Sequence, residues 1–172
     1  MKHKNGGANA ATSADTKNDL ARDTRQKVID ILNARVADAI DLQYQVRTAH
    51  FNVKGPSFGT LHALFETVYK AVDEFIDELA ERAVQLGGTA LSTVRISAER
   101  SNLEEYPNDV REGLAHAELV SDRLAAFGKL VRENIDEADD LGDKDTADLF
   151  TEVSREIDKY VWMVEAHNQA DR

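Results

Sequence analysis

The segment RTAHFNVKGPSFGTLHALFE, residues 47–66, decides the fold because it contains the break between two long amphipathic stretches. It carries two of the chain's five histidines, His50 and His62, on either side of Gly55-Pro56. Glycine and proline end helices, because glycine adopts left-handed backbone angles and proline lacks the amide hydrogen that a helix needs. The segment therefore predicts two helices joined by a short turn, with one histidine on each side of the turn.

Apolar residues with a spacing of 3.6 lie on both sides of this break. Before it, they predict a helix over about residues 20–51. After it, Ser57 is the expected N-cap of a second helix, which ends at Gly87-Gly88, a pair suited to a left-handed C-terminal stop. The first half of the chain is thus predicted to be a helical hairpin.

The second half of the chain repeats this pattern after a long connection. Residues 89–106, TALSTVRISAERSNLEEY, are too many for a plain antiparallel loop, and they contain one short helical stretch near residues 92–100. Pro107 begins a third predicted helix that ends near Gly142, and a fourth covers about residues 144–168. Four long helices with one long crossover indicate an all-α fold, a ferritin-like four-helix bundle with a short helix in the central crossover.

Length and composition fit one globular domain. The 172 residues are 42% hydrophobic and 31% charged, whereas residues 1–19 are small and polar without apolar periodicity. We expect a flexible N-terminal tail over residues 1–19 and the bundle over residues 20–172. No apolar run is long enough to cross a bilayer and no secretory signal is visible, so we expect a cytoplasmic protein that does not contact membranes.

The absence of cysteine limits the chemistry of any metal site. A chain with no cysteine has no disulfide, no thiolate ligand and no cysteine nucleophile. Histidine, aspartate and glutamate are then the available ligands, which favours iron, manganese or zinc. The net charge of −11 argues against nucleic-acid binding by the folded body, and it suits a surface that attracts cations.

The histidine spacing argues against a di-iron centre inside one bundle. Such centres use a Glu-x-x-His pair on each of two helices, because side chains at i and i+3 project into the core together. The residues three positions before His50, His62, His116 and His167 are instead Arg47, Gly59, Gly113 and Val164, in that order.

The second helix carries two other pairs of possible ligands. His62 and Glu66 are four residues apart, and so are Asp77 and Glu81. His62 and Asp77 are separated by 15 residues, which is about 22 Å of helix rise and about 60° of rotation, so one metal cannot reach both pairs on one straight helix. Two copies crossing antiparallel about a twofold axis would join the pairs in two identical sites, with His50 as a further ligand. The alternative is that the histidines pack in the core and the acidic pairs are solvated.

At these residues the chain resembles the Dps family, the DNA-binding proteins from starved cells or miniferritins. The resemblance is carried by AHFNVKGPSFGTLHALFE, DELAERAVQLGGTAL and DTADLFTEVSREIDKYVWMVEAH, and it covers about residues 20–168. It implies a hollow homododecamer that oxidises Fe(II), preferably with hydrogen peroxide, and stores ferric oxide. The cell and its DNA would thereby be protected from oxidative damage.

The resemblance also implies a residue assignment for the iron site. His50, His62 and Glu66 would come from one subunit and Asp77 and Glu81 from its partner, with two iron ions per site. Two residues depart from the family pattern: Glu66 stands where aspartate is more frequent, and Phe51 where many members have tryptophan.

Two further assignments rest on the same resemblance. The acidic run ENIDEADDLGDKDTADLF, residues 133–150, corresponds to a region that lines threefold pores in similar proteins, and the resemblance points to Asp139, Asp143 and Asp148 here. Some family members bind DNA through a lysine-rich tail, and the corresponding residues here are Lys2, Lys4 and Lys17. A nucleoid-binding structural protein that acts mainly through this tail is therefore the alternative function, and a plain helical bundle with histidines in its core is a third.

Overall fold

The computed structural model describes residues 15–169, and within them every regular element is helical. The elements are, in order, α1 (Arg22–Asn52), α2 (Phe58–Gln85), α3 (Val94–Arg100), α4 (Gly113–Asp140), α5 (Lys144–Glu165) and a final 3-10 turn, η1 (Ala166–Asn168). Of the predicted tail, Lys2 and Lys4 lie outside the described residues. Lys17 is exposed and precedes α1.

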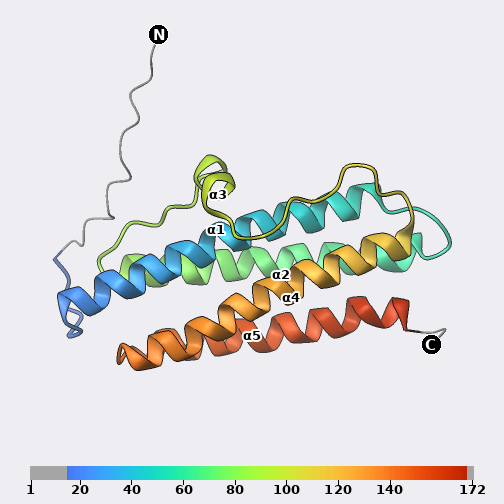
Figure 1. Ribbon diagram of the computed structural model, residues 1–172. Helices are drawn as coiled ribbons and strands as arrows, with labels where there is room; N and C mark the ends of the chain where they lie inside the picture. Colours follow the sequence, from blue (N-terminus) through green and yellow to red (C-terminus); the bar gives the residue numbers. More distant parts are fainter. Residues whose placement is uncertain (1–14, 170–172) are drawn as a thin grey trace, which may run out of the picture.

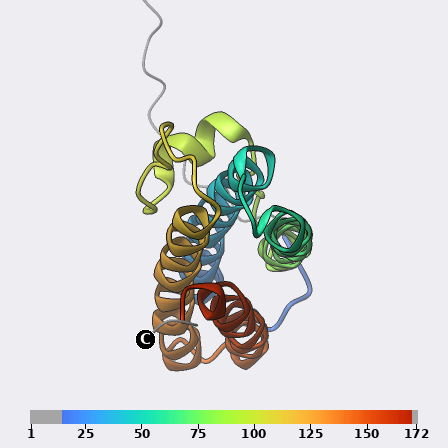
Figure 2. The ribbon, with the colours of Figure 1, turned by 90° about the vertical axis from the view of Figure 1, so that its right-hand side faces the viewer.

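The long helices form two antiparallel pairs, α1 with α2 and α4 with α5 (Figure 1). Because α2 and α4 run in the same direction, the chain between them has to travel the length of the bundle. This crossover carries α3 on the outside of α1, while the four long helices surround one core (Figure 2). The predicted four-helix bundle with a short helix in its crossover is confirmed.

The predicted helix stops agree with the structure, and they use glycine for a physical reason. Gly87 has a φ of 89°, which side chains disfavour, and it ends α2. The amide of Gly88 donates to the carbonyl of Ala83, and that of Gly87 to Val84, both at 2.9 Å. These bonds satisfy carbonyl groups that the end of a helix leaves unpaired.

One predicted helix start is wrong. The third long helix begins at Gly113 and not at Pro107. Tyr106 is buried, and its hydroxyl lies 2.6 Å from Nδ1 of His116 in the first turn of α4. Ten residues of helix would separate Tyr106 and His116 by about 15 Å. The segment between them therefore has to be irregular for this hydrogen bond to form.

The start of α2 differs in one detail from the prediction. Ser57 occupies the N-cap position, but its side chain makes no capping hydrogen bond. The turn before it depends on Gly55, whose φ is 96°. In the first turns of α2, Leu61 and Phe65 are fully buried. Their burial fixes the rotation of the helix and leaves the neighbouring His62 partly exposed.

Candidate metal centre

His50 and His62 come together at one end of the bundle. His50 lies in the last turn of α1 and His62 in the second turn of α2, and the turn through Gly55 reverses the chain between them. Their rings stack with centroids 3.7 Å apart and planes inclined by 23°. Of the two, His50 is buried and His62 is partly exposed.

Each histidine ring is held by the backbone of the other. Nδ1 of His50 lies 2.8 Å from the carbonyl oxygen of His62, and Nδ1 of His62 lies 2.9 Å from the carbonyl oxygen of His50. A carbonyl oxygen only accepts, so both Nδ1 atoms carry hydrogen and donate. In the neutral rings the lone pair is then on Nε2, and neither Nε2 hydrogen-bonds to any residue in the described part of the chain. This is the tautomer and orientation that a metal ligand needs.

Aromatic side chains and one arginine surround the histidine pair. Tyr69 and Phe51 each approach His50 edge-on, with centroids 5.4 Å from its ring. The guanidinium carbon of Arg47 lies 5.2 Å from the centre of the Tyr69 ring and 6.0 Å from that of Phe51. Sequence reasoning did not select Arg47 or Tyr69. The available signal is spacing, since Arg47 is three residues before His50 and Tyr69 seven after His62.

Glu66 forms an ion pair with Lys70 of the same subunit. Its Oε1 lies 2.6 Å from Nζ of Lys70, one turn further along α2. This contact lowers the pKa of Glu66, and the nearby His50 and His62 rings lower it further. Glu66 is therefore an ionised carboxylate near the histidine pair. Its ion-pair partner Lys70 was not among the residues selected from the sequence.

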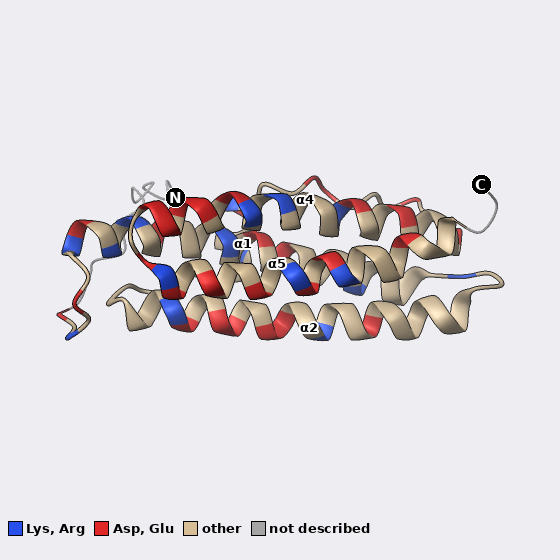
Figure 3. Cartoon of the chain, turned by 90° about the horizontal axis from the view of Figure 1, so that it is seen from below, with Lys and Arg blue, Asp and Glu red and all other residues tan. Residues whose placement is uncertain are grey.

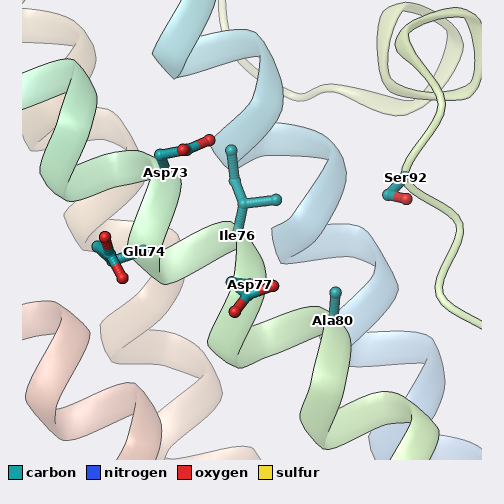
Figure 4. Close-up of a pocket in the computed structure, with 6 residues that line it drawn as sticks. All are labelled: Asp73, Glu74, Ile76, Asp77, Ala80 and Ser92. Carbon is teal, nitrogen blue, oxygen red and sulfur yellow. The ribbon is translucent and has the colours of Figure 1, made fainter.

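Asp77 and Glu81 lie further along α2, away from the histidines. Asp77 lines an open pocket of about 320 Å³ with Asp73, Glu74 and Ser92 (Figure 4). Asp73 also accepts a hydrogen bond from Gln43 of α1, at 2.6 Å. Within residues 15–169 of one chain, no three His, Asp or Glu side chains gather closely enough to hold a metal ion. The structure thus unites His50 with His62 and leaves the two carboxylates apart from them.

The three carboxylates assigned to a pore have different surroundings. Asp148 is exposed, and Asp139 pairs with Lys144 at 2.7 Å. Asp143 is buried, caps the start of α5 by accepting the amide of Thr146, and pairs with Arg82 at 2.8 Å. Because the carboxylate of Asp143 is buried and bonded inside the subunit, we assign Asp143 a structural role and not a place in a pore.

Comparison with known proteins agrees with this architecture. The ferritin-like domain family matches residues 29–172. A curated relative from Agrobacterium fabrum, called DNA protection during starvation protein, is 41% identical over 154 residues, covering 90% of this chain and 95% of its own. The chain belongs to the Dps family of ferritin-like proteins.

Solved structures of Dps proteins superpose on the whole bundle. A Dps protein from Bacillus brevis is 31% identical with a TM-score of 0.80, covering 86% of this chain and 98% of its own. A Dps protein from Vibrio cholerae is 27% identical with a TM-score of 0.83, covering 92% and 100%, and it is described as a ferritin-like diiron-carboxylate protein. Among the described residues, no helix is long and apolar enough to cross a membrane.

Proposed function

We propose that this protein is a ferroxidase and iron store of the Dps type. It oxidises Fe(II), preferably with hydrogen peroxide, at sites shared between two subunits, and it stores ferric oxide inside a dodecameric shell in the cytoplasm. DNA and other cell components are thereby protected from oxidative damage during stress. The observation that carries this proposal is the pair of Nε2 atoms left open by the reciprocal hydrogen bonds of His50 and His62.

The donor set suits iron as a substrate. Imidazole nitrogen binds Fe(II) well, and carboxylate oxygen favours the more highly charged Fe(III). His50 and His62 supply nitrogen from one subunit, while Asp77 and Glu81 of a second subunit supply oxygen. Two Fe(II) ions held together give two electrons to one hydrogen peroxide molecule, which takes up two protons and leaves as two molecules of water.

The charge distribution supports the delivery of cations. The chain carries a net charge of −11, and acidic residues recur along α2 and α5 (Figure 3). A surface with one sign of charge raises the local concentration of oppositely charged ions. Asp139 and Asp148 remain the pore residues in this proposal, because Asp148 is exposed and Asp139 pairs only with an exposed lysine.

A double substitution tests the ferroxidase site. His50→Ala with His62→Ala removes both imidazoles, and we expect the rate of Fe(II) oxidation by hydrogen peroxide to fall at least about tenfold. The matched control is His167→Ala, because His167 lies in η1 and its Nδ1 contacts the carbonyls of Met163 and Val164 at the end of α5, away from the histidine pair in the chain. If the double variant oxidised Fe(II) as fast as the control, the site assignment would be wrong. The mass of the particle in solution checks the twelve-subunit shell.

DNA binding through the tail is the second candidate function, and Lys17 is its one residue in the described part of the chain. Lys17 is exposed and free of helical structure. Deletion of residues 1–19 would abolish retardation of DNA in a gel at low salt and leave iron oxidation unchanged. If the intact protein did not retard DNA under these conditions, the tail would have another role.

A further inference from the structure

The two ends of α2 carry complementary apolar features. At the start of the helix, Phe58 is 48% exposed, and the centroid of its ring lies 5.1 Å from the centroid of the His62 ring. At the other end, Val84 is 54% exposed. It lines an open pocket of about 350 Å³ with Ala80, Ala90, Glu81 and Gln85, and the area exposed in this pocket is mainly apolar. An exposed aromatic ring and an exposed apolar pocket on one helix suit contact between two copies of the chain.

The register of such a contact follows from the proposed function, on which this inference rests. If His62 of one copy faces Asp77 and Glu81 of another across a twofold axis, α2 crosses its copy antiparallel. Four residues toward the N-terminus on one helix then correspond to four residues toward the C-terminus on the other. Phe58 precedes His62 by four residues, so it faces the turn 81–85, which contains Val84.

The same register matches opposite charges nearer the axis. Tyr69 follows His62 by seven residues, so it faces the turn 70–74 of the second copy, which includes Asp73 and Glu74. Arg47 lies over the Tyr69 ring. In Figure 3 the C-terminal half of α2 carries most of its acidic residues. One arrangement therefore brings imidazole to carboxylate, arginine to aspartate and phenylalanine to an apolar pocket.

We propose that Phe58 docks into the pocket lined by Ala80, Val84 and Ala90 of a second copy of this chain. This contact closes the outer end of the shared metal site and sets the register that brings Asp77 and Glu81 to His62. Because the Phe58 ring touches the His62 ring, docking also holds the imidazole in place. Phe58 is thus a positioning residue for the site.

A disulfide between copies tests the contact, since the chain has no cysteine of its own. Positions 58 and 84 of one chain are about 39 Å apart along the helix, far beyond the reach of a disulfide. In the variant Phe58→Cys with Val84→Cys, any bond between these positions must therefore join two copies. We expect mild oxidation to give covalent dimers of this variant on a non-reducing gel. The single variants Phe58→Cys and Val84→Cys are the controls and remain monomers on the gel.

The outcomes separate this inference from the proposed function. No dimer in the double variant, or equal dimer in a single variant, overturns the docking of Phe58 even if iron oxidation depends on His50 and His62. Specific dimers together with an active His50→Ala, His62→Ala variant would instead preserve the contact and reject the ferroxidase site.

A second variant does not depend on disulfide formation. Phe58→Ala changes an exposed side chain, so the subunit fold is retained, and we expect subunits to dissociate at about tenfold higher protein concentration with slower iron oxidation. Phe58→Leu restores both properties in part, because leucine fills the same pocket. Leu114→Ala is the matched control, since Leu114 is 47% exposed on the first turn of α4. Equal behaviour of Phe58→Ala and Leu114→Ala would contradict the proposal.

Discussion

Two polar clusters at opposite ends of the bundle differ in how completely they are satisfied. Near the α4–α5 turn, Arg82 donates to Asp143 at 2.8 Å and to the Thr146 hydroxyl at 2.9 Å. Asp143 also accepts the amide and the hydroxyl of Thr146. No buried side-chain nitrogen or oxygen of Arg82, Asp143 or Thr146 lacks a hydrogen-bond partner within the chain. At the other end, His50 and His62 satisfy one nitrogen each and leave the second open.

This difference separates a structural role from a binding role. A buried polar cluster whose hydrogen bonds close within the chain stabilises the fold, because any missing partner would be costly. Rings that are fixed in orientation but keep a free lone pair are prepared for a ligand. Asp143 was selected as a pore carboxylate from the resemblance, but its hydrogen bonds to Arg82 and Thr146 within the chain indicate a structural role.

The largest effect that would test this comparison is expected at Asp143. Asp143→Ala leaves Arg82 partly buried without its ion-pair partner and removes the cap of α5, so we expect a loss of about 3–5 kcal/mol in the free energy of unfolding. Urea unfolding at equal protein concentration measures it. Asp145→Ala is the control, because Asp145 is 87% exposed and 3.9 Å from Arg82, and it should cost less than about 1 kcal/mol. Equal losses in the two variants would contradict the structural role of the cluster formed by Arg82, Asp143 and Thr146.

A smaller effect is expected at Tyr106, whose hydroxyl forms a hydrogen bond with Nδ1 of the buried His116. Tyr106→Phe removes the hydroxyl and leaves Nδ1 of the buried His116 without this partner. We expect a loss of about 1–3 kcal/mol in the free energy of unfolding, with iron oxidation unchanged. Thermal unfolding and the oxidation rate check both parts. A wild-type stability would mean that water replaces the hydroxyl.

The smallest effect concerns the pH dependence of stability at His116. Burial lowers the pKa of His116 below its usual 6.5, and the backbone of Asn52 opposes this shift in part. Between the lowered pKa and 6.5 the unfolded chain binds the proton more readily than the folded one. His116 therefore makes the protein less stable as pH falls below about 6.5, with a slope of at most about 1.4 kcal/mol per pH unit, and has no such effect above.

Urea unfolding between pH 7.5 and 5.5 measures this slope in the wild type and in His116→Gln. We expect a flatter dependence in the variant, because glutamine does not titrate. The same slope in both proteins would show that other groups cause the dependence.

Much of the fold was predictable because its signals are local. Apolar spacing marks the faces of the four long helices. Gly87 and Gly142 follow the ends of α2 and α4, and Gly55 forms the turn between α1 and α2, all at backbone angles that other residues disfavour. The start of α4 was not predictable, since the Tyr106–His116 contact between a loop and a helix overrides the signal of Pro107. Ser57 is a similar case: its N-cap position was predicted from the sequence, but its side chain makes no capping hydrogen bond.

For the site, the sequence by itself determined that His50 and His62 flank one turn and that Asp77 and Glu81 lie too far along the same helix to join them. Helix rise and the Gly55 break are enough for both statements. Only the tertiary structure decided which nitrogen of the His50 and His62 rings is free. It also decided that Glu66 pairs with Lys70 and that Asp143 pairs with Arg82. The physical reason is that periodicity places a residue on a face, whereas hydrogen-bond partners depend on the atoms that packing brings within about 3 Å.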